Sequence, residues 1–457
     1  MREFKILAAT GALGYGLSEE LFREAMKRKP DMVGADGGSN DGGPYYLGHG
    51  ASHCDDRSIE RELRIILPCV RDAGIPFLIG SASTAGGEPH IEKTLKIIKG
   101  ICKEIGWSAK TAVIHAEIPA EYMHEKFDLG KIEALDCAPE LTKKDIDECV
   151  RIVGQMGTEP FIRALDTGAD IIVAGRACDT AVFAALPIKL GFDPALCFHA
   201  AKIVECGAYC CSPGGGADPM WVTIREKDFI LETLNDARKV LPLSVAAHSL
   251  YEQGHPSKFY EPDGMTDCST AKFEAYNGSD KAVIVSGSKF VGAEDGKYTL
   301  KIEGAAREGY RCACIAGIRD VYMIKNIDSV LENVNAHIKS NTDKDDYKIK
   351  YRIFGKNAVM GDLEYEPCTA KEIGVLTDVL AETQERANTI CAMARSGILH
   401  TPYPERRSTG GNVAMAFSPH DIPVGPVYRF GIYHIIKDLS NKDFEKLFPV
   451  EIVEVKI

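Results

Sequence analysis

The sequence predicts an α/β protein, in which an N-terminal domain with a parallel sheet and glycine-rich βα loops precedes an α+β domain with an antiparallel or mixed sheet. Through about the first 210 residues, short apolar runs alternate with amphipathic segments, a pattern typical of βαβ units. After the breaker Ser212–Gly216 the apolar runs alternate with period two instead. We therefore expect domains at residues 1–225 and 226–457.

The predicted strands of the first domain are short apolar runs bounded by small or polar residues: Phe4–Ala8, Pro30–Val33, Phe77–Ile79, Ala112–His115 and Ile171–Ala174. The predicted helices between them have helical apolar periodicity: Ser18–Lys27, Ile59–Asp72, Pro89–Ile105, Lys143–Gly154, Glu159–Thr167 and Ala181–Leu190. Asp193 and Pro194 predict the start of a further helix over about Ala195–Tyr209. In the second domain, period-two runs such as WVTIRE and YKIKYRIFG predict strands, and Ile327–Lys339 and Lys371–Ser396 predict helices.

Composition excludes several classes of function. The 54 Lys and Arg against 66 Asp and Glu leave a net charge of −12, which argues against a nucleic-acid partner held by phosphate contacts. No apolar run approaches the ~20 residues that cross a bilayer, and the apolar part of the N-terminus is too short and glycine-rich for a secretory signal. The 15 cysteines show no C-x-x-C spacing and are expected to be reduced and mostly buried. We expect a cytoplasmic homo-oligomer with no membrane partner.

Polar and glycine-rich loops follow the predicted strands, and ligands of parallel α/β sheets bind at the carboxyl ends of the strands. The first loop, Thr10–Gly16, lacks the G-x-G-x-x-G register, and the chain has no P-loop, so the sequence contains no NAD or ATP motif. The second loop, Gly34–Gly50, carries acidic, amide and hydroxyl side chains suited to a divalent cation or a substrate hydroxyl: Asp36, Ser39, Asn40 and Asp41. The same residue types also form plain turns.

Two further strand ends carry polar side chains. Ser81 and Thr84 follow the third strand and suit either a carboxylate cradle or simple helix capping. Arg176 and Asp179 follow the fifth.

The predicted helix over Ala195–Tyr209 is apolar apart from a few polar residues. His199 and Lys202 share one face of it, and Glu205 lies beside Lys202. A lysine and a glutamate on a buried helix need partners. Either they pair with each other, or Lys202 joins Arg176 and His199 in a cationic patch for an acidic substrate, with Glu205 transferring protons.

Long motifs along the chain resemble the acyclic terpene utilisation (AtuA) family. They are GADGGSNDGGPYYLG, GSASTAGGEPH, GRACDTAVFAALPIKLGFD, HAAKIVECGA, SVAAHSLYE and VSGSKFVG. The helix motif commonly reads HMGKILECGA in that family, where this chain has Ala200, Ala201 and Val204. The resemblance runs in order through most of the chain.

The resemblance implies a role in degrading branched, unsaturated acids or their acyl-CoA esters. We expect a hydratase or other lyase acting on a small acidic substrate. Its catalytic residues would be His199, Glu205, Lys202 and Asp36, and its substrate-binding residues Gly37, Gly38, Ser39, Asn40, Ser81, Thr84, Arg176, His248 and Tyr251. A divalent metal ion on Asp36, Asp41 and Asp179 would be an alternative means of stabilising an enolate.

Two other functions stay open at this point. The first is hydrolysis of an ester, amide or thioester by Cys178 or Cys206, and the second is a non-catalytic subunit that binds acyl-CoA. The resemblance also implies a small companion domain of about 100 residues, fused or separate. Because the chain ends at Ile457 without it, we expect a separate small subunit.

Overall fold

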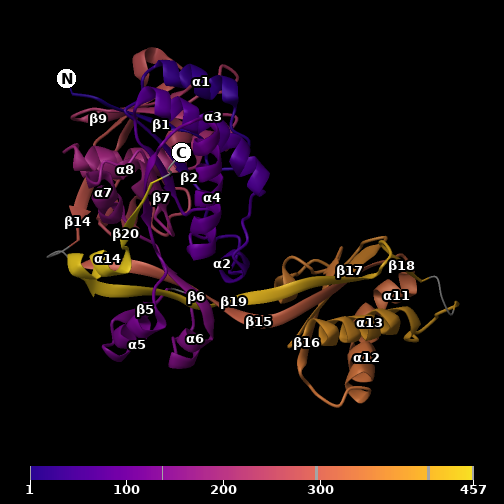
Figure 1. The fold of residues 1–457 in the computed structure, drawn as a ribbon. Coiled ribbons are helices and arrows are strands. Elements are labelled where there is room, and N and C mark those ends of the chain that lie inside the picture. The colour runs from indigo at the N-terminus through magenta and orange to yellow at the C-terminus, as the bar shows by residue number, and fades with distance from the viewer. Residues whose placement is uncertain (1, 136, 294–296, 409–411, 455–457) are drawn as a thin grey trace. The chain divides into compact units, whose positions relative to one another are not determined.

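The computed structural model describes residues 2–135, 137–293, 297–408 and 412–454, which form two compact units. The first unit contains residues 1–306 and 430–457, and the second contains 307–429. Two long strands, β15 (Tyr298–Ile318) and β19 (Asp421–Leu439), run from one unit into the other (Figure 1). The first unit therefore extends well past residue 225, where we expected the chain to divide.

The centre of the first unit is a parallel sheet built from the five strands expected from the sequence. These are β1 (Phe4–Ala8), β2 (Met32–Asp36), β3 (Phe77–Gly80), β4 (Lys110–Ile114) and β7 (Ile171–Ala174). Their order is β1-β2-β3-β7-β4, and all four neighbouring pairs are parallel. All five carboxyl ends therefore lie at one edge of the sheet.

Antiparallel strands extend this sheet to ten strands at both sides. The strands β8 (Met220–Ile224), β9 (Asp228–Thr233), β13 (Ala282–Ser286) and β12 (Lys272–Ala275) follow one another outward from β1, and β20 (Val450–Glu454) pairs with β4. The switch to period-two alternation after residue 215 thus marks a change from parallel to antiparallel pairing within one sheet. This is why the first unit does not end at residue 225.

Helices cover both faces of the sheet, and side chains alternate between two cores. On β1, Ile6 and Ala8 face one apolar cluster, while Leu7 faces the other. The first face carries α7 (Thr158–Asp166), α8 (Asp179–Lys189) and α9 (Pro194–Val204). The second carries α1 (Glu19–Lys27), α3 (Asp56–Ala73) and α4 (Glu88–Glu104).

Two predicted helices are wrong in part, because each merges a helix with a strand. Residues predicted as Lys143–Gly154 form α6 (Lys143–Glu148) and then β6 (Cys149–Gly154), which pairs with β15. Residues predicted as Lys371–Ser396 form β17 (Ile373–Ala381), whose buried residues alternate, and then α13 (Gln384–His400). In β17 the period-two alternation wins over helical periodicity, and in both segments a strand forms because sheet partners are present.

The helix after Asp193 is shorter than expected. It ends at Val204, and a 3₁₀ turn, Gly207–Cys210, follows. Gly207 has φ 61, and a Cβ there would lie 2.7 Å from the backbone nitrogen of Gly11. The close approach to the first strand's loop therefore stops the helix.

The remaining elements of the first unit are peripheral to the ten-stranded sheet. A three-stranded sheet has the order β10-β11-β14. Its strands are β10 (Lys258–Glu261), β11 (Gly264–Asp267) and β14 (Lys289–Gly292). The other peripheral elements are β5 (Ile132–Ala134), α2 (Tyr45–His49), α5 (Ala120–Asp128), α10 (Pro242–Ser249) and α14 (Asn441–Leu447).

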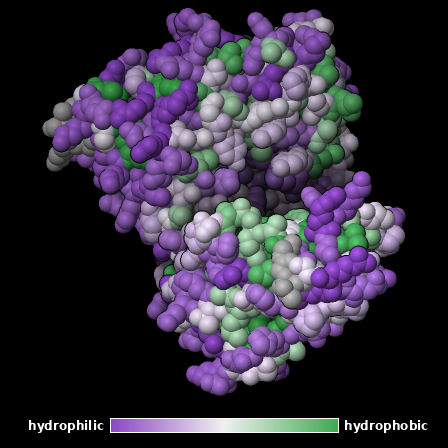
Figure 2. All heavy atoms as spheres, turned by 90° about the vertical axis from the view of Figure 1, so that its right-hand side faces the viewer, coloured by the Kyte–Doolittle hydropathy of each residue, from purple (hydrophilic) through white to green (hydrophobic). Residues whose placement is uncertain are grey.

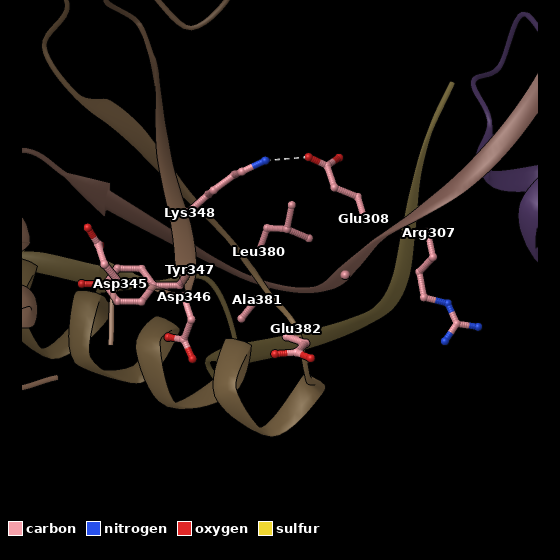
Figure 3. A pocket seen from close by; sticks show the side chains of 10 residues that line it. Arg307, Glu308, Asp345, Asp346, Tyr347, Lys348, Leu380, Ala381 and Glu382 are labelled. Carbon is pink, nitrogen blue, oxygen red and sulfur yellow. Dashed lines mark hydrogen bonds and ion pairs between the residues drawn. The ribbon is translucent and has the colours of Figure 1, made fainter. Parts of the chain in front are cut away.

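The second unit packs helices on one face of a sheet formed by β16 (Tyr347–Phe354), β17, β18 (Val413–Met415) and parts of the two long strands. Its helices are α11 (Val321–Lys325), α12 (Ile327–Ser340) and α13. At the end of β16 and β17 lies a hollow of about 380 Å³, where Lys348 donates a 2.8 Å hydrogen bond to Glu308 (Figure 3). These charged side chains are largely solvated, so the hollow is typical of an ordinary polar surface.

Apolar side chains form scattered patches on the face drawn in Figure 2. The exposed large apolar side chains of the second unit include Val359, Leu363 and Tyr365. In the described parts of the chain, no helix combines the length and apolarity needed to span a bilayer.

The loop after β3 depends on a glycine that touches the end of β7. A Cβ on Gly86, which has φ +64, would lie 2.2 Å from the backbone nitrogen of Arg176. We expect Gly86→Ala to lower the free energy of unfolding by about 2–4 kcal/mol through this clash and the left-handed backbone. Gly100→Ala is the matched control, since nothing lies within 4 Å of its Cβ position inside α4, and it should stabilise by about 1 kcal/mol. Urea denaturation measures both, and equal effects would contradict the packing argument.

Candidate functional site

A cleft of about 520 Å³ opens in the first unit beside the carboxyl ends of the parallel strands. It is lined by residues that come from eight separate segments of the chain: Ser39, Asp41, Gln155, Arg176, Cys178, Asp179, Thr180, Lys202, Glu205, Glu252, Gln253, Phe259, Tyr260, Glu261, Lys301 and Tyr433. The βα loops expected to meet at one edge therefore do so, and later parts of the chain close the cleft over them.

The first part of the site is a buried ion pair. Arg176, 2% exposed, donates from Nε to Oε2 of Glu303 at 2.9 Å. The same Oε2 accepts from Asn40 at 2.6 Å, and Lys301 lies 3.0 Å from Oε1. Although burial alone raises the pKa of Glu303, Arg176 and Lys301 lower it to about 2. Glu303 is therefore ionised, and Arg176 is paired within the protein instead of acting as a free anion clamp.

The loop after β3 completes the support of Arg176. Ser81 Oγ accepts from Arg176 and from the backbone N–H of Ala177, both at 3.2 Å. Ser81, Ser83 and Thr84 have φ values of 44, 45 and 94, a region that costs non-glycine residues about 1–2 kcal/mol each. Thr84 Oγ1 accepts from the N–H of His53 at 2.8 Å. Ser81 and Thr84, which we expected to bind substrate, therefore accept hydrogen bonds from Arg176, Ala177 and His53 of the protein itself.

The glycine loops use their N–H groups within the protein. In the first loop, the N–H groups of Gly14, Gly16 and Leu17 all donate to the buried carboxylate of Glu62, at 2.6–2.8 Å. This internal carboxylate takes the place where a phosphate would bind in a nucleotide site.

In the second loop, Gly37 donates from its N–H to the carbonyl of Gly80 at 2.8 Å, and Gly38 donates to Asp36 at 2.9 Å. A Cβ on Gly37 would lie 2.7 Å from that same carbonyl oxygen. Gly37 and Gly38 are required for close packing between loops, so their N–H groups do not point to a ligand.

Lys202 and Glu205 at the end of α9 are hydrogen bonded to each other inside the cleft. The i, i+3 spacing places both on one face, as the sequence predicted. Burial raises the pKa of Glu205 to about 8, although Lys202 acts in the opposite direction. Burial alone lowers the pKa of Lys202, but Glu205 and Asp179 more than offset this and raise it, so Lys202 keeps its charge.

Three further carboxyl groups have raised pKa values: Asp179 and Glu261, which line the cleft and are partly buried, and Asp36, which is buried outside the lining. Burial raises the pKa of Glu261 to about 7. Burial also raises the pKa of Asp36 well above its ordinary value, with Asp179 adding to the effect, and raises that of Asp179 although Arg176 opposes it. Asp36 Oδ1, Asp179 Oδ1 and Glu261 Oε2 have no hydrogen-bond partner within the described ranges. A poorly solvated carboxyl group with a raised pKa and one oxygen free of hydrogen bonds is suited to accept or donate a proton.

The charges of the cleft correct the prediction of a cationic patch. Its lining contains Asp41, Asp179, Glu205, Glu252 and Glu261 against Arg176, Lys202 and Lys301. Burial raises the pKa of Glu205 to about 8 and that of Glu261 to about 7, so these two carboxyl groups are partly protonated near neutral pH. The site is therefore acidic and proton-rich, with Lys202 as its most prominent cation.

His199 does not reach the cleft. It is fully buried, its ring nitrogens lie 2.6 Å from Ser288 Oγ and 2.9 Å from Ser249 Oγ, and burial lowers its pKa to about 3. Phe229 and Phe273 pack edge-on against its ring. His199 is a neutral core residue, which corrects its assignment to the cationic patch.

His248 and Tyr251 lie behind Lys202, outside the lining. Their rings are stacked with centroids 5.4 Å apart, and Lys202 Nζ is 5.9 Å from the Tyr251 ring centre. Burial and the charge of Lys202 lower the pKa of His248 to about 4. They support the position of Lys202 and do not line the substrate space.

The predicted metal ligands are not brought together as a binding set. Ser39 donates a 2.7 Å hydrogen bond to Asp41, and Asp36 is held by Gly38. Among the residues with described positions, no three His, Cys, Asp or Glu side chains gather closely enough to hold a metal ion. Asp36, Asp41 and Asp179 therefore offer no ready metal site.

Sequence reasoning missed Glu261, Glu303, Lys301 and Tyr433. Glu261 lies on β10 and Tyr433 on β19, far along the chain from the glycine loops. Lys301 and Glu303 are two apart on one strand and so share a face, which is a weak hint of a paired polar face. No local pattern indicates that this face is buried against Arg176.

The Arg176–Glu303 pair is expected to stabilise the first unit strongly. Glu303→Gln leaves the buried guanidinium without its counter-charge and should lower the free energy of unfolding at pH 7 by about 3–5 kcal/mol. Glu303 has its folded pKa lowered from 4.5 to about 2, so its contribution is complete above pH 4.5 and is lost as the pH falls through about 2. Denaturant unfolding from pH 7 to pH 3 should show the difference from wild type shrinking.

The control for this prediction is Glu308→Gln on the same strand, because Glu308 pairs with the exposed Lys348. An exposed ion pair of this kind contributes about 0–1 kcal/mol to the free energy of unfolding. A loss equal to that of Glu303→Gln would contradict the buried-pair interpretation.

Comparison with known proteins agrees with the motifs quoted from the sequence. A family model described as acyclic terpene utilisation family protein AtuA matches residues 56–221 and 229–410. No curated protein and no solved structure matches the chain significantly. The matched segments include the loop after β7, helix α9 and strand β10, which together supply most of the residues that line the cleft. The chain belongs to the acyclic terpene utilisation family AtuA.

Proposed function

We propose that this protein is a hydro-lyase that adds or removes water next to the carbonyl group of a carboxylic acid or its acyl-CoA ester. The observation that carries the proposal is the presence in one cleft of two carboxyl groups with pKa values near neutrality, the partly buried Glu261 at about 7 and the buried Glu205 at about 8. Acid–base catalysts work best when their pKa lies near the working pH.

In this proposal Glu261, whose pKa burial raises to about 7, is the base. Glu205, whose pKa burial raises to about 8 although Lys202 opposes the shift, is the acid. In dehydration of a 3-hydroxy acyl compound, Glu261 removes the proton on the carbon beside the carbonyl. The electron pair forms the carbon–carbon double bond as the carbon–oxygen bond breaks, and Glu205 donates its proton so that the hydroxyl leaves as water.

Lys202 supplies charge stabilisation in this scheme. Its ammonium group contacts Glu205 and is charged, so it can stabilise the negative charge that develops on the carbonyl oxygen of the substrate. Arg176 is a positioning residue, because its side chain is occupied by Glu303 and Ser81.

Hydrolysis by a cysteine nucleophile is less well supported. Burial raises the pKa of both Cys178 and Cys206, and the acidic neighbours Glu261 and Glu205 respectively raise them further. A thiol must ionise to attack a carbonyl group. A separate small companion subunit and a homo-oligomeric state remain part of the proposal.

The first test is turnover of 3-hydroxy and α,β-unsaturated acids and their CoA esters, by the protein alone and with any protein that co-purifies with it. Glu261→Gln and Glu205→Gln should each lower kcat about 10²- to 10⁴-fold, because each removes a proton-transfer group. Glu226→Gln, exposed and outside the cleft, should retain wild-type activity. Absence of turnover with every compound, or full activity in both variants, would overturn the proposal.

The second test is the pH dependence of kcat/KM for dehydration. Activity should rise as Glu261 loses its proton through about pH 7 and fall as Glu205 loses its proton above about pH 8. Glu261→Gln should abolish the acidic limb in the residual activity and leave the alkaline limb. An unchanged acidic limb in that variant would assign the base to another residue.

A further inference from the structure

A second, apolar cavity of about 470 Å³ adjoins the acidic cleft within the first unit. Its walls include Cys137, Ala138 and Pro139 after β5, Phe430 and Tyr433 on β19, and Asn40 of the second glycine loop. Asp41 and Tyr433 line both spaces, so the cleft and the cavity adjoin at these two residues.

The two spaces differ in chemistry on either side of Tyr433. Lys301 Nζ, which lines the cleft, lies 4.6 Å from the centre of the Tyr433 ring. The Phe430 ring, which lines the cavity, lies 5.3 Å from the same ring. A ligand that occupies both spaces must therefore have one polar and one apolar end.

Asn40 adds a hydrogen-bonding requirement at this junction. The residue is 2% exposed, and its Nδ2 donates to Glu303, which fixes the orientation of the amide. Its Oδ1 is buried with no hydrogen-bond partner among the described residues. A buried oxygen of this kind costs free energy unless a donor, such as a ligand hydroxyl, reaches it.

We infer that the apolar cavity binds the hydrocarbon chain of the substrate, whose acid–base chemistry takes place in the adjoining cleft, with a substrate hydroxyl donating to Asn40 Oδ1. This rests on the proposed function and deepens it: the substrate class is a hydroxy acid, free or esterified, with an extended apolar chain. Ala138 and Phe430 then determine how much chain the site accepts.

The test is calorimetric binding of unbranched 3-hydroxy acids of about four to about ten carbons, for which affinity should rise roughly fourfold per added methylene until the cavity is full. Ala138 is half-buried, and the Ala138→Phe variant should bind the shortest acid with wild-type affinity. Its affinity should no longer rise as the acid becomes longer. Ala237→Phe, exposed and outside both spaces, is the matched control and should keep the gain. No gain in wild type, no binding at all, or a gain retained in Ala138→Phe overturns the inference.

Thiol protection gives a readout that needs no variant. Cys137 lines the cavity and is exposed, and Cys368 in the second unit is exposed elsewhere. The longest acid should slow alkylation of Cys137 by N-ethylmaleimide and leave Cys368 unchanged, as followed by mass spectrometry. Equal rates at Cys137 with and without saturating acid overturn the inference.

These results separate the two proposals. Length-dependent binding and Cys137 protection without any turnover would remove the hydro-lyase function and keep the chain-binding cavity. Turnover of short acids, with no effect of chain length on binding, would keep the hydro-lyase function and remove the chain-binding cavity.

Discussion

The buried ion pair between Arg176 and Glu303 is the interaction on which the rest of the site depends. Arg176 follows β7, Glu303 lies on β15, and Ser81 and Asn40 reach the pair from the loops after β3 and β2. Four segments that are distant in the chain thus meet at one guanidinium–carboxylate contact. Because a buried charge is costly when unpaired, each segment must be in place before the others are stable.

The glycine-rich loops that dominate the sequence form the scaffold of this arrangement. Gly37 and Gly86 allow backbones to approach where a Cβ would lie 2.7 Å or less from a neighbouring backbone atom. Glu62 takes up the N–H groups of the first loop. The strained backbone at Ser81, Ser83 and Thr84 is retained because it supports Arg176, as expected when strain lies beside a functional site.

Burial raises the pKa of both Glu303 and Glu261, but neighbouring cations reverse the shift at Glu303. Glu303, with two cations beside it, has a pKa of about 2, whereas Glu261 has a pKa of about 7. One carboxylate is permanently charged and structural, and the other is free to exchange a proton.

The sequence by itself determined the five parallel strands and the edge where their loops meet, because local periodicity marks the strands and parallel strands end on the same side. Its motifs indicated the family. It left the pairing of Lys202 with Glu205 as one of two alternatives. Only the tertiary structure decided that His199 is a core residue, that Arg176 is neutralised by Glu303, and that Glu261 faces the cleft. Burial and partners across more than a hundred residues set these roles, and no local pattern encodes a partner so far along the chain.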